Sequence, residues 1–159
     1  MAGRYPKIEA VHLYIDALCL EVVRAPEQFE VIVTNNLFGD IVTDLGAALQ
    51  GGLGMAASAN VHAKDRGRVA MFEPVHGSAP PLAGKDIANP FAAFLTVGMM
   101  LTHLGWAAEE RRIEGAVRRA LAEGQCTRDV GGVLGTKAAA AWVRDEIGRT
   151  LGQEPSIKP

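Results

Sequence analysis

The sequence predicts an α/β fold, and three observations support this prediction. Short runs of β-branched residues alternate with segments of helical periodicity in the first third of the chain. The 159 residues are 48% hydrophobic and 21% charged, a composition that can bury a core and is unlike that of a disordered tail. Glycine occurs 18 times and aromatic residues make up only 6%, which favours close packing of helices on a sheet. The length is that of one ordinary domain.

The amino-terminal elements are predicted in the order strand, helix, strand, helix. The β-branched and aromatic content of Ala10–Ile15 predicts a strand, and Asp16 is placed to cap a helix over Ala17–Arg24. The short apolar run Val31–Thr34 is typical of a strand covered on both faces. The apolar positions of Leu37–Leu49 recur with helical spacing, so a second helix is expected there.

The carboxy-terminal elements begin after a glycine-rich segment, Gly51–Gly54, which is predicted to be a crossing between domains. Val69–Phe72 is predicted to be a buried strand, and Glu73–Ala88 is predicted to be irregular because it holds three prolines and two glycines. Asn89 followed by Pro90 indicates a helix start, and that helix is expected to be buried on nearly every side. The predicted helices are Pro90–Leu104, Trp106–Glu123 and Thr136–Ile147, the last capped by Thr136 and followed by a frayed tail over Gly148–Pro159.

Charge, cysteine content and hydropathy exclude several classes of protein. Sixteen basic and 18 acidic residues give a net charge of -2, so no nucleic-acid partner is expected. Cys19 and Cys126 are too few and too far apart for a disulfide framework or a metal cluster. The first residues have no apolar core of the kind that a signal peptide needs, and the longest apolar run, Phe91–Leu101, is too short to cross a bilayer. These features predict a cytoplasmic protein without a membrane partner.

Three aspartates are candidate ligands for a divalent cation. Asp40 and Asp44 are four residues apart, so their directions on a helix differ by about 40° and they share one face. Asp16 lies where a predicted strand becomes a helix, at the edge of a sheet where α/β proteins bind ligands. Magnesium prefers oxygen ligands of this kind. The spacing alone equally allows a helix cap and two solvated carboxylates.

A second candidate site is the long polar segment between Glu73 and Pro90. His76, Gly77 and Ser78 offer backbone N–H groups, an imidazole and a hydroxyl that suit a phosphate or an adenine edge, and Asn89 stands at a helix start. The alternative is an ordinary Pro/Gly connector. By contrast, Gly52-x-Gly54-x-x-Ala57 satisfies the dinucleotide fingerprint but follows a helix and opens none. Its glycines are expected to allow close packing instead.

These stretches together resemble the isocitrate/3-isopropylmalate dehydrogenase family of metal-dependent β-decarboxylating dehydrogenases. The matching stretches are Tyr14–Ala17 (YIDA), Val31–Asp44 (VIVTNNLFGDIVTD), Gly52–Ala59 (GLGMAASA) and Glu73–Pro90 (EPVHGSAPPLAGKDIANP). The forms NLFGD and GKDIANP are most similar to the 3-isopropylmalate branch, and homoisocitrate and D-malate/tartrate dehydrogenases share much of them. The resemblance implies part of that family's fold, a three-layer α/β/α sheet without its amino-terminal half.

The resemblance also implies roles for individual residues. Asp40 and Asp44 would bind Mg²⁺ or Mn²⁺ in their own subunit, and Asp16 would bind it across a homodimer. The bound metal would chelate a 2-hydroxy diacid substrate, whose hydride passes to NAD before carbon dioxide leaves. The implied cofactor-binding residues are Glu73, His76, Gly77, Ser78, Ala79, Pro80, Leu82 and Asn89.

The sequence indicates less clearly whether the cofactor is NAD or NADP. Family members that use NAD usually carry an acidic residue after HGSAP, and those that use NADP often carry Lys-Tyr. This chain has Pro81-Leu82, which matches neither pattern. Because position 81 has no cation to bind a 2′-phosphate, we favour NAD over NADP.

Family members are about twice as long, and the part without a counterpart here is amino-terminal. In the family that part holds the substrate-clamping arginines and the catalytic tyrosine and lysine, so no catalytic residue is assigned in this chain. Residues 1–51 would end the second, dimer-forming domain, and 52–159 would form the second half of the cofactor domain. We expect strand edges and apolar patches to be exposed, and the isolated chain to be inactive.

Other functions remain open from the sequence. The chain could be a truncated, non-catalytic module that dimerises or binds a nucleotide. It could also be a small α/β enzyme that uses Asp16, Asp40 and Asp44 for metal-assisted hydrolysis. Within the dehydrogenase interpretation, homoisocitrate, isocitrate and tartrate or D-malate are alternative substrates.

Overall fold

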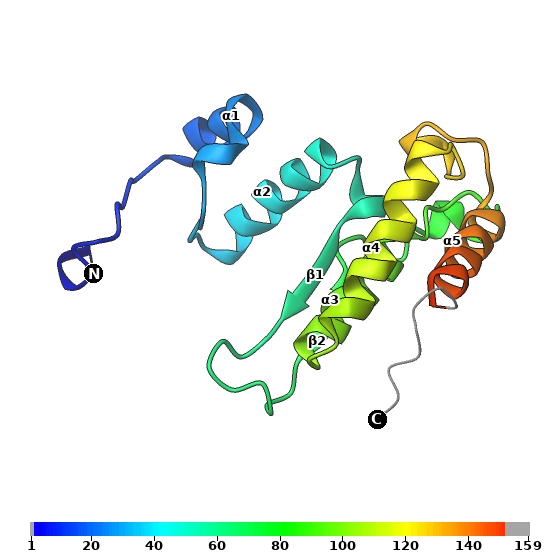
Figure 1. The fold of residues 1–159 in the computed structure, drawn as a ribbon. Coiled ribbons are helices and arrows are strands. Elements are labelled where there is room, and N and C mark those ends of the chain that lie inside the picture. Colours follow the sequence, from blue (N-terminus) through cyan, green and yellow to red (C-terminus); the bar gives the residue numbers. More distant parts are fainter. Residues whose placement is uncertain (1, 152–159) are drawn as a thin grey trace. The chain divides into compact units, whose positions relative to one another are not determined.

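The computed structural model describes residues 2–151 and divides the chain into two compact units, Met1–Leu49 and Gln50–Pro159. We call them the first and the second unit; Figure 1 shows the elements of each. The division falls next to the glycine-rich segment. The roles predicted for the two parts, a dimer-forming and a cofactor-binding domain, stay predictions. No helix in the described part of the chain is long and apolar enough to span a membrane.

The first unit is built from two α-helices that pack on each other, α1 (Ile15–Arg24) and α2 (Asn36–Leu49). Asn35 Oδ1 accepts a hydrogen bond from the backbone N–H of Phe38 at 3.0 Å and thereby caps α2. Short 3₁₀ turns lie at Ala2–Arg4 and Pro26–Gln28. Among the described residues of this unit, the buried apolar ones are Leu18, Val22 and Ala47. The prediction of α2 is confirmed within one residue.

The two strands predicted in the first unit are wrong. Residues 9–14 and 31–35 are irregular, and Ile15 is already helical. Val31 is 81% exposed and Val33 is 90% exposed, so the described residues leave these two side chains almost uncovered. A strand requires a neighbouring strand for its backbone hydrogen bonds, which a β-branched sequence cannot supply by itself. Single apolar side chains are therefore exposed in this unit, while the predicted apolar patches stay a prediction.

The second unit contains a two-stranded antiparallel sheet of β1 (Ala57–Asn60) and β2 (Met71–Pro74). Ala57 pairs with Pro74 and Asn60 with Met71. The strand predicted at Val69–Phe72 is therefore displaced by two residues, and it is not buried, since Met71 is 52% exposed. The sequence ASAN of β1 has little β propensity, so no strand was predicted there, and pairing with β2 forms it.

The second unit also contains three helices, α3 (Phe91–His103), α4 (Ala107–Ala122) and α5 (Thr136–Leu151), and α3 packs on the sheet. α3 contacts both strands and α4, and α5 runs back alongside α4 (Figure 1). Short 3₁₀ turns lie at Leu53–Met55, Pro80–Leu82 and Arg128–Val130. The core residues are Phe91, Ala116, Val117, Ala120, Cys126, Ala139 and Val143.

The helices predicted in the second unit are confirmed with two corrections. α3 is not buried on every side, because the sheet and α4 leave Val97 43% exposed. α5 continues to Leu151, four residues beyond its predicted end, so residues 148–151 of the predicted frayed tail are helical. The rest of that tail lies outside the described residues.

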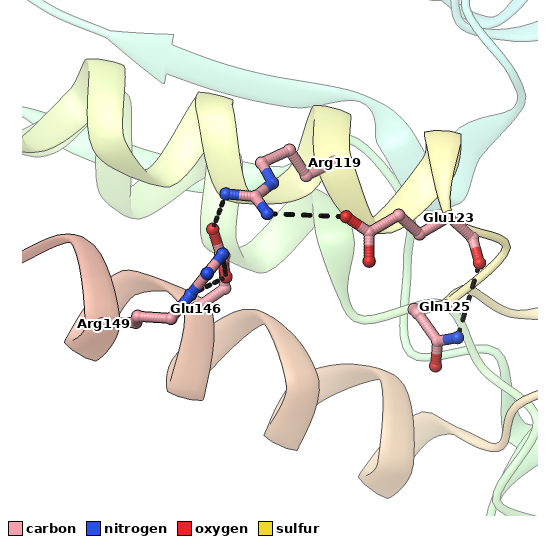
Figure 2. A network of polar contacts seen from close by, with 5 residues as sticks. All are labelled: Arg119, Glu123, Gln125, Glu146 and Arg149. Atoms are coloured by element: carbon pink, nitrogen blue, oxygen red, sulfur yellow. Dashed lines mark hydrogen bonds and ion pairs between the residues drawn. The ribbon is translucent and has the colours of Figure 1, made fainter.

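A buried glutamate joins α4 to α5, as Figure 2 shows. Glu146 of α5 is 6% exposed, and its Oε1 lies 2.5 Å from Nη1 of Arg119 on α4. Its Oε2 accepts hydrogen bonds from Nε and Nη2 of Arg149 at 2.9 and 2.6 Å. Arg119 also lies 3.5 Å from Glu123. Two cations therefore neutralise the one buried carboxylate between the helices.

Candidate functional site

The first candidate site is the pair of carboxylates on α2. Asp40 and Asp44 are both exposed and one helical turn apart, so they project from one side of the helix. Asn36 Nδ2 donates a hydrogen bond to Oδ2 of Asp40 at 3.1 Å. In the part of the chain that the structure describes, no basic residue pairs with either aspartate. Two unneutralised carboxylates on one face supply hard oxygen ligands that a divalent cation prefers.

Asp16 lies on the other helix of the same unit. It is exposed in the first turn of α1, and its Oδ1 accepts a hydrogen bond from the backbone N–H of Ala17 at 2.8 Å. The prediction that Asp16 caps this helix is wrong, because Tyr14 occupies the N-cap position without a side-chain hydrogen bond. Residues 2–151 hold no group of three or more His, Cys, Asp or Glu side chains that could bind a metal. The α2 pair therefore fits a cation as part of a coordination set.

The second candidate site is the loop from Val75 to Asn89, here called the 75–89 loop. Glu73 precedes it as an exposed residue of β2, paired with Ser58. His76, Gly77 and Ser78 are exposed, and His76 Nδ1 lies 2.9 Å from the carbonyl oxygen of Gly77. None of the hydrogen bonds found among the described residues uses the backbone N–H groups of residues 76–79. These consecutive free donors, with the Ser78 hydroxyl, fit an anionic or polar ligand.

The middle of the 75–89 loop has an unusual backbone. Ala79 lies in the left-handed region, with φ 44° and ψ 60°, directly before the 3₁₀ turn that contains Pro80 and Leu82. A non-glycine residue in this region costs on the order of 1 kcal/mol. The Ala79 carbonyl accepts a hydrogen bond from the N–H of Leu82 at 2.9 Å, which closes the turn. Leu82 itself is partly exposed.

Asn89 ends the loop and is hydrogen-bonded within the protein. Its Oδ1 accepts from the N–H of Phe91 at 2.9 Å, so its side chain binds the first N–H of α3, although Pro90 and not Asn89 occupies the N-cap position. Its Nδ2 donates to Oδ2 of Asp129 at 2.9 Å. A Cβ on Gly54 would lie 2.6 Å from the Cβ of Asn89, so only glycine fits there. The expectation that Gly54 serves packing is thus confirmed, and β1 rather than a helix follows the false fingerprint.

Asp86 is a residue of this region that the sequence analysis missed. Its Oδ1 accepts from the N–H of Lys137 at 3.0 Å, and its carbonyl accepts from the N–H of Thr136 at 3.1 Å, so Asp86 caps α5. The predicted cap by Thr136 is wrong, since its hydroxyl donates to the carbonyl of Ala88 at 2.5 Å. Asp86 is 50 residues before α5, and no local pattern indicates such a contact.

Comparisons with known proteins agree with the resemblance seen in the sequence. The isocitrate/isopropylmalate dehydrogenase family model matches residues 1–147. The 3-isopropylmalate dehydrogenase of Methanothermobacter thermautotrophicus is 50% identical over 151 residues, which cover 95% of this chain and 44% of the relative. That of Archaeoglobus fulgidus is 52% identical over 136 residues, 86% of this chain and 40% of the relative.

A solved structure extends the similarity to three dimensions. The isocitrate dehydrogenase from Methylococcus capsulatus has a TM-score of 0.83 and 43% identity, and the match covers 92% of this chain and 43% of that one. The chain therefore spans about two fifths of the length of these relatives. The family model matches nearly the whole sequence, and the solved structure shares the α/β fold. The chain therefore belongs to the isocitrate/isopropylmalate dehydrogenase family.

Proposed function

We propose that this chain is the carboxy-terminal part of a metal-dependent dehydrogenase that oxidises and decarboxylates 3-isopropylmalate with NAD. The observation that carries this proposal is 50% identity to a 3-isopropylmalate dehydrogenase over 95% of the chain. The free carboxylates of α2 and the unpaired backbone donors of the 75–89 loop give additional support, because both have the chemistry that this reaction needs.

The metal would be Mg²⁺ or Mn²⁺, held by Asp40 and Asp44 of one subunit. Asp16 of a second copy would complete the set. When bound, the cation supplies Lewis-acid polarisation of the substrate hydroxyl and stabilises developing negative charge. Asn36 holds the Asp40 carboxylate through a hydrogen bond at 3.1 Å and thereby orients this ligand.

The 75–89 loop would bind the cofactor. The N–H groups of residues 76–79 and the Ser78 hydroxyl would donate hydrogen bonds to it, with the nicotinamide ring as the hydride acceptor. Glu73, Pro80, Leu82 and Asn89 would complete this site. We assign NAD rather than NADP because Pro81 and Leu82 offer no charge for a 2′-phosphate.

Proton transfer and substrate clamping would belong to residues of the relatives that this chain does not match. We therefore expect no turnover from the purified chain alone. A hybrid tests the proposal: this chain replaces the matching residues of the Methanothermobacter thermautotrophicus relative, and NADH formation is followed with 3-isopropylmalate, NAD and Mg²⁺. We expect turnover by the hybrid.

Asp40→Asn in the hybrid should lower kcat/KM about 100-fold or more and weaken Mn²⁺ binding, since loss of even an outer partner of a metal ligand costs 10- to 100-fold. Asp145→Asn is the matched control, because Asp145 is an exposed carboxylate whose one ion pair among residues 2–151 is with its neighbour Arg144. It should change neither quantity.

The alternative functions give different results in the same experiment. A hybrid that folds but turns over no 2-hydroxy diacid would support the non-catalytic module. Turnover of isocitrate, homoisocitrate, tartrate or D-malate in preference to 3-isopropylmalate would reassign the substrate. Unchanged Mn²⁺ affinity in Asp40→Asn would remove both the dehydrogenase metal site and metal-assisted hydrolysis.

A further inference from the structure

The 75–89 loop is connected to the rest of the second unit at its two ends. At its start, the N–H of Val75 donates to the carbonyl of Ala56 at 3.0 Å. At its end, Asp86, Ala88 and Asn89 are hydrogen-bonded to other elements. Between them, every hydrogen bond found for residues 76–85 among the described residues stays inside the loop. The position of the middle of the loop therefore depends on how firmly its ends are held.

Asp86 makes the connection of the loop to α5. Its carboxylate and its carbonyl together accept the first two N–H groups of that helix, from Thr136 and Lys137. The negative charge also lies at the positive end of the helix dipole. The Thr136 hydroxyl donates back to the carbonyl of Ala88, so the two segments exchange hydrogen bonds in both directions.

At this connection the loop and the start of α5 lie very close together. Asp86 has φ 54°, a left-handed conformation that aspartate, asparagine and glycine adopt more readily than other residues. A Cβ on Gly135 would lie 2.4 Å from Oδ2 of Asp86 and 2.7 Å from its carbonyl oxygen. The start of α5 can therefore approach Asp86 only because residue 135 is glycine.

We propose that Asp86 is a positioning residue that holds the 75–89 loop in its cofactor-binding conformation by fastening it to the first turn of α5. This inference rests on the proposed function of the loop. Without the connection, the loop must be ordered when the cofactor binds, and this entropic cost weakens binding. Chemistry in the bound complex needs no contact with Asp86, so the effect should be on KM for NAD and not on kcat.

The first experiment uses the 159-residue chain without any ligand. Asp86→Gly removes the carboxylate but keeps a residue suited to φ 54°, so the backbone is not strained. We expect hydrogen exchange of the Leu82, Ala83 and Lys85 amides, followed by NMR, to accelerate about two- to thirty-fold, the range that loss of a helix cap produces. Asp86→Asn, whose amide oxygen still accepts from Lys137, should restore the slow exchange.

A matched control separates positioning from a general loss of stability. Val143→Ala also weakens α5, but from its fully buried side and far along the helix from Asp86. It should lower Tm without accelerating the loop amides, because these exchange through local opening.

The second experiment uses the hybrid enzyme. Asp86→Gly should raise KM for NAD about two- to thirty-fold with kcat nearly unchanged, and Asp86→Asn should return KM to the parent value. An inactive parent hybrid with accelerated loop exchange would overturn the proposed function and leave the connection through Asp86 established. An active parent with unchanged KM in Asp86→Gly would overturn the positioning role alone.

Gly135→Ala provides a second, independent variant if Asp86→Gly does not fold. It leaves every acceptor of Asp86 in place but pushes the Asp86 carbonyl away from α5. The same acceleration of loop exchange and the same rise in KM are expected. Unchanged exchange in Gly135→Ala, or equal acceleration in Val143→Ala, would contradict the proposal.

Discussion

The second unit encloses Phe91, Val117 and Val143 completely, whereas the first unit leaves Val31 and Val33 almost fully exposed. Both units carry apolar runs of similar composition. The difference is that the second unit contains the partners of its apolar residues: β1 pairs with β2, and α3 packs on both strands and on α4. In the first unit, α1 and α2 supply only three buried apolar residues. An apolar run thus becomes regular structure only where its partners are present.

The largest expected effect is a difference between the two units in how much a core substitution lowers the free energy of unfolding. Phe91→Ala should lower the free energy of unfolding by about 3–5 kcal/mol, because it empties a fully buried position of the core. Leu18→Ala in the first unit should change the same transition by less than about 0.5 kcal/mol. Tryptophan fluorescence in urea measures it, because Trp106 and Trp142 both belong to the second unit. Equal losses would show that the two units unfold as one body.

A smaller effect concerns the contact of α4 with α5. Glu146→Gln should lower the unfolding free energy by about 1–2 kcal/mol, because it removes the charged acceptor of two arginines. The loss is limited because both arginines are half exposed and can bind water instead. Glu114→Gln, which breaks an exposed pair with Arg118, should cost less than about 0.5 kcal/mol. The urea midpoints of the two variants give the comparison. Similar midpoints would show that burial of Glu146 adds nothing.

The smallest expected effect is a difference in reactivity between one thiol of each unit, measured in the folded chain. Burial raises the pKa of the Cys126 thiol, and the nearby Asp129 carboxylate raises it further. The thiolate is the reactive form, so Cys126 should react with iodoacetamide more slowly than the half-buried Cys19 at pH 8. A raised pKa also means that this reaction of Cys126 begins at higher pH. Mass spectrometry of the folded chain measures the reaction rates of both thiols. As a control, unfolding the chain in urea should make the two rates equal. Equal rates in the folded chain would contradict the burial of Cys126.

Local patterns predicted the helices and part of the candidate sites. The periodicity of Leu37–Leu49 placed α2 within one residue, and the i,i+4 spacing placed Asp40 and Asp44 on one side of it. Glu114 and Arg118 are likewise four residues apart, and they form an ion pair at 2.7 Å on α4. These features depend on residues three or four positions apart, which helical geometry brings together wherever the helix lies.

Contacts between distant segments could not be predicted in this way. Thr136 has the usual identity of a helix cap, but Asp86, 50 residues earlier, takes that role. β1 forms from a sequence of low β propensity because β2 is beside it, whereas Val31–Thr34 has high propensity and forms no strand.

The sequence by itself therefore determined the family, the order of the helices with their approximate extents, and which carboxylates share a helix face. Only the tertiary structure decided which apolar runs become strands, which residue caps α5 and how the 75–89 loop is held at both ends. The physical reason is that helical hydrogen bonds close within four residues, whereas strand pairing and loop anchoring need partners that only the folded chain brings near.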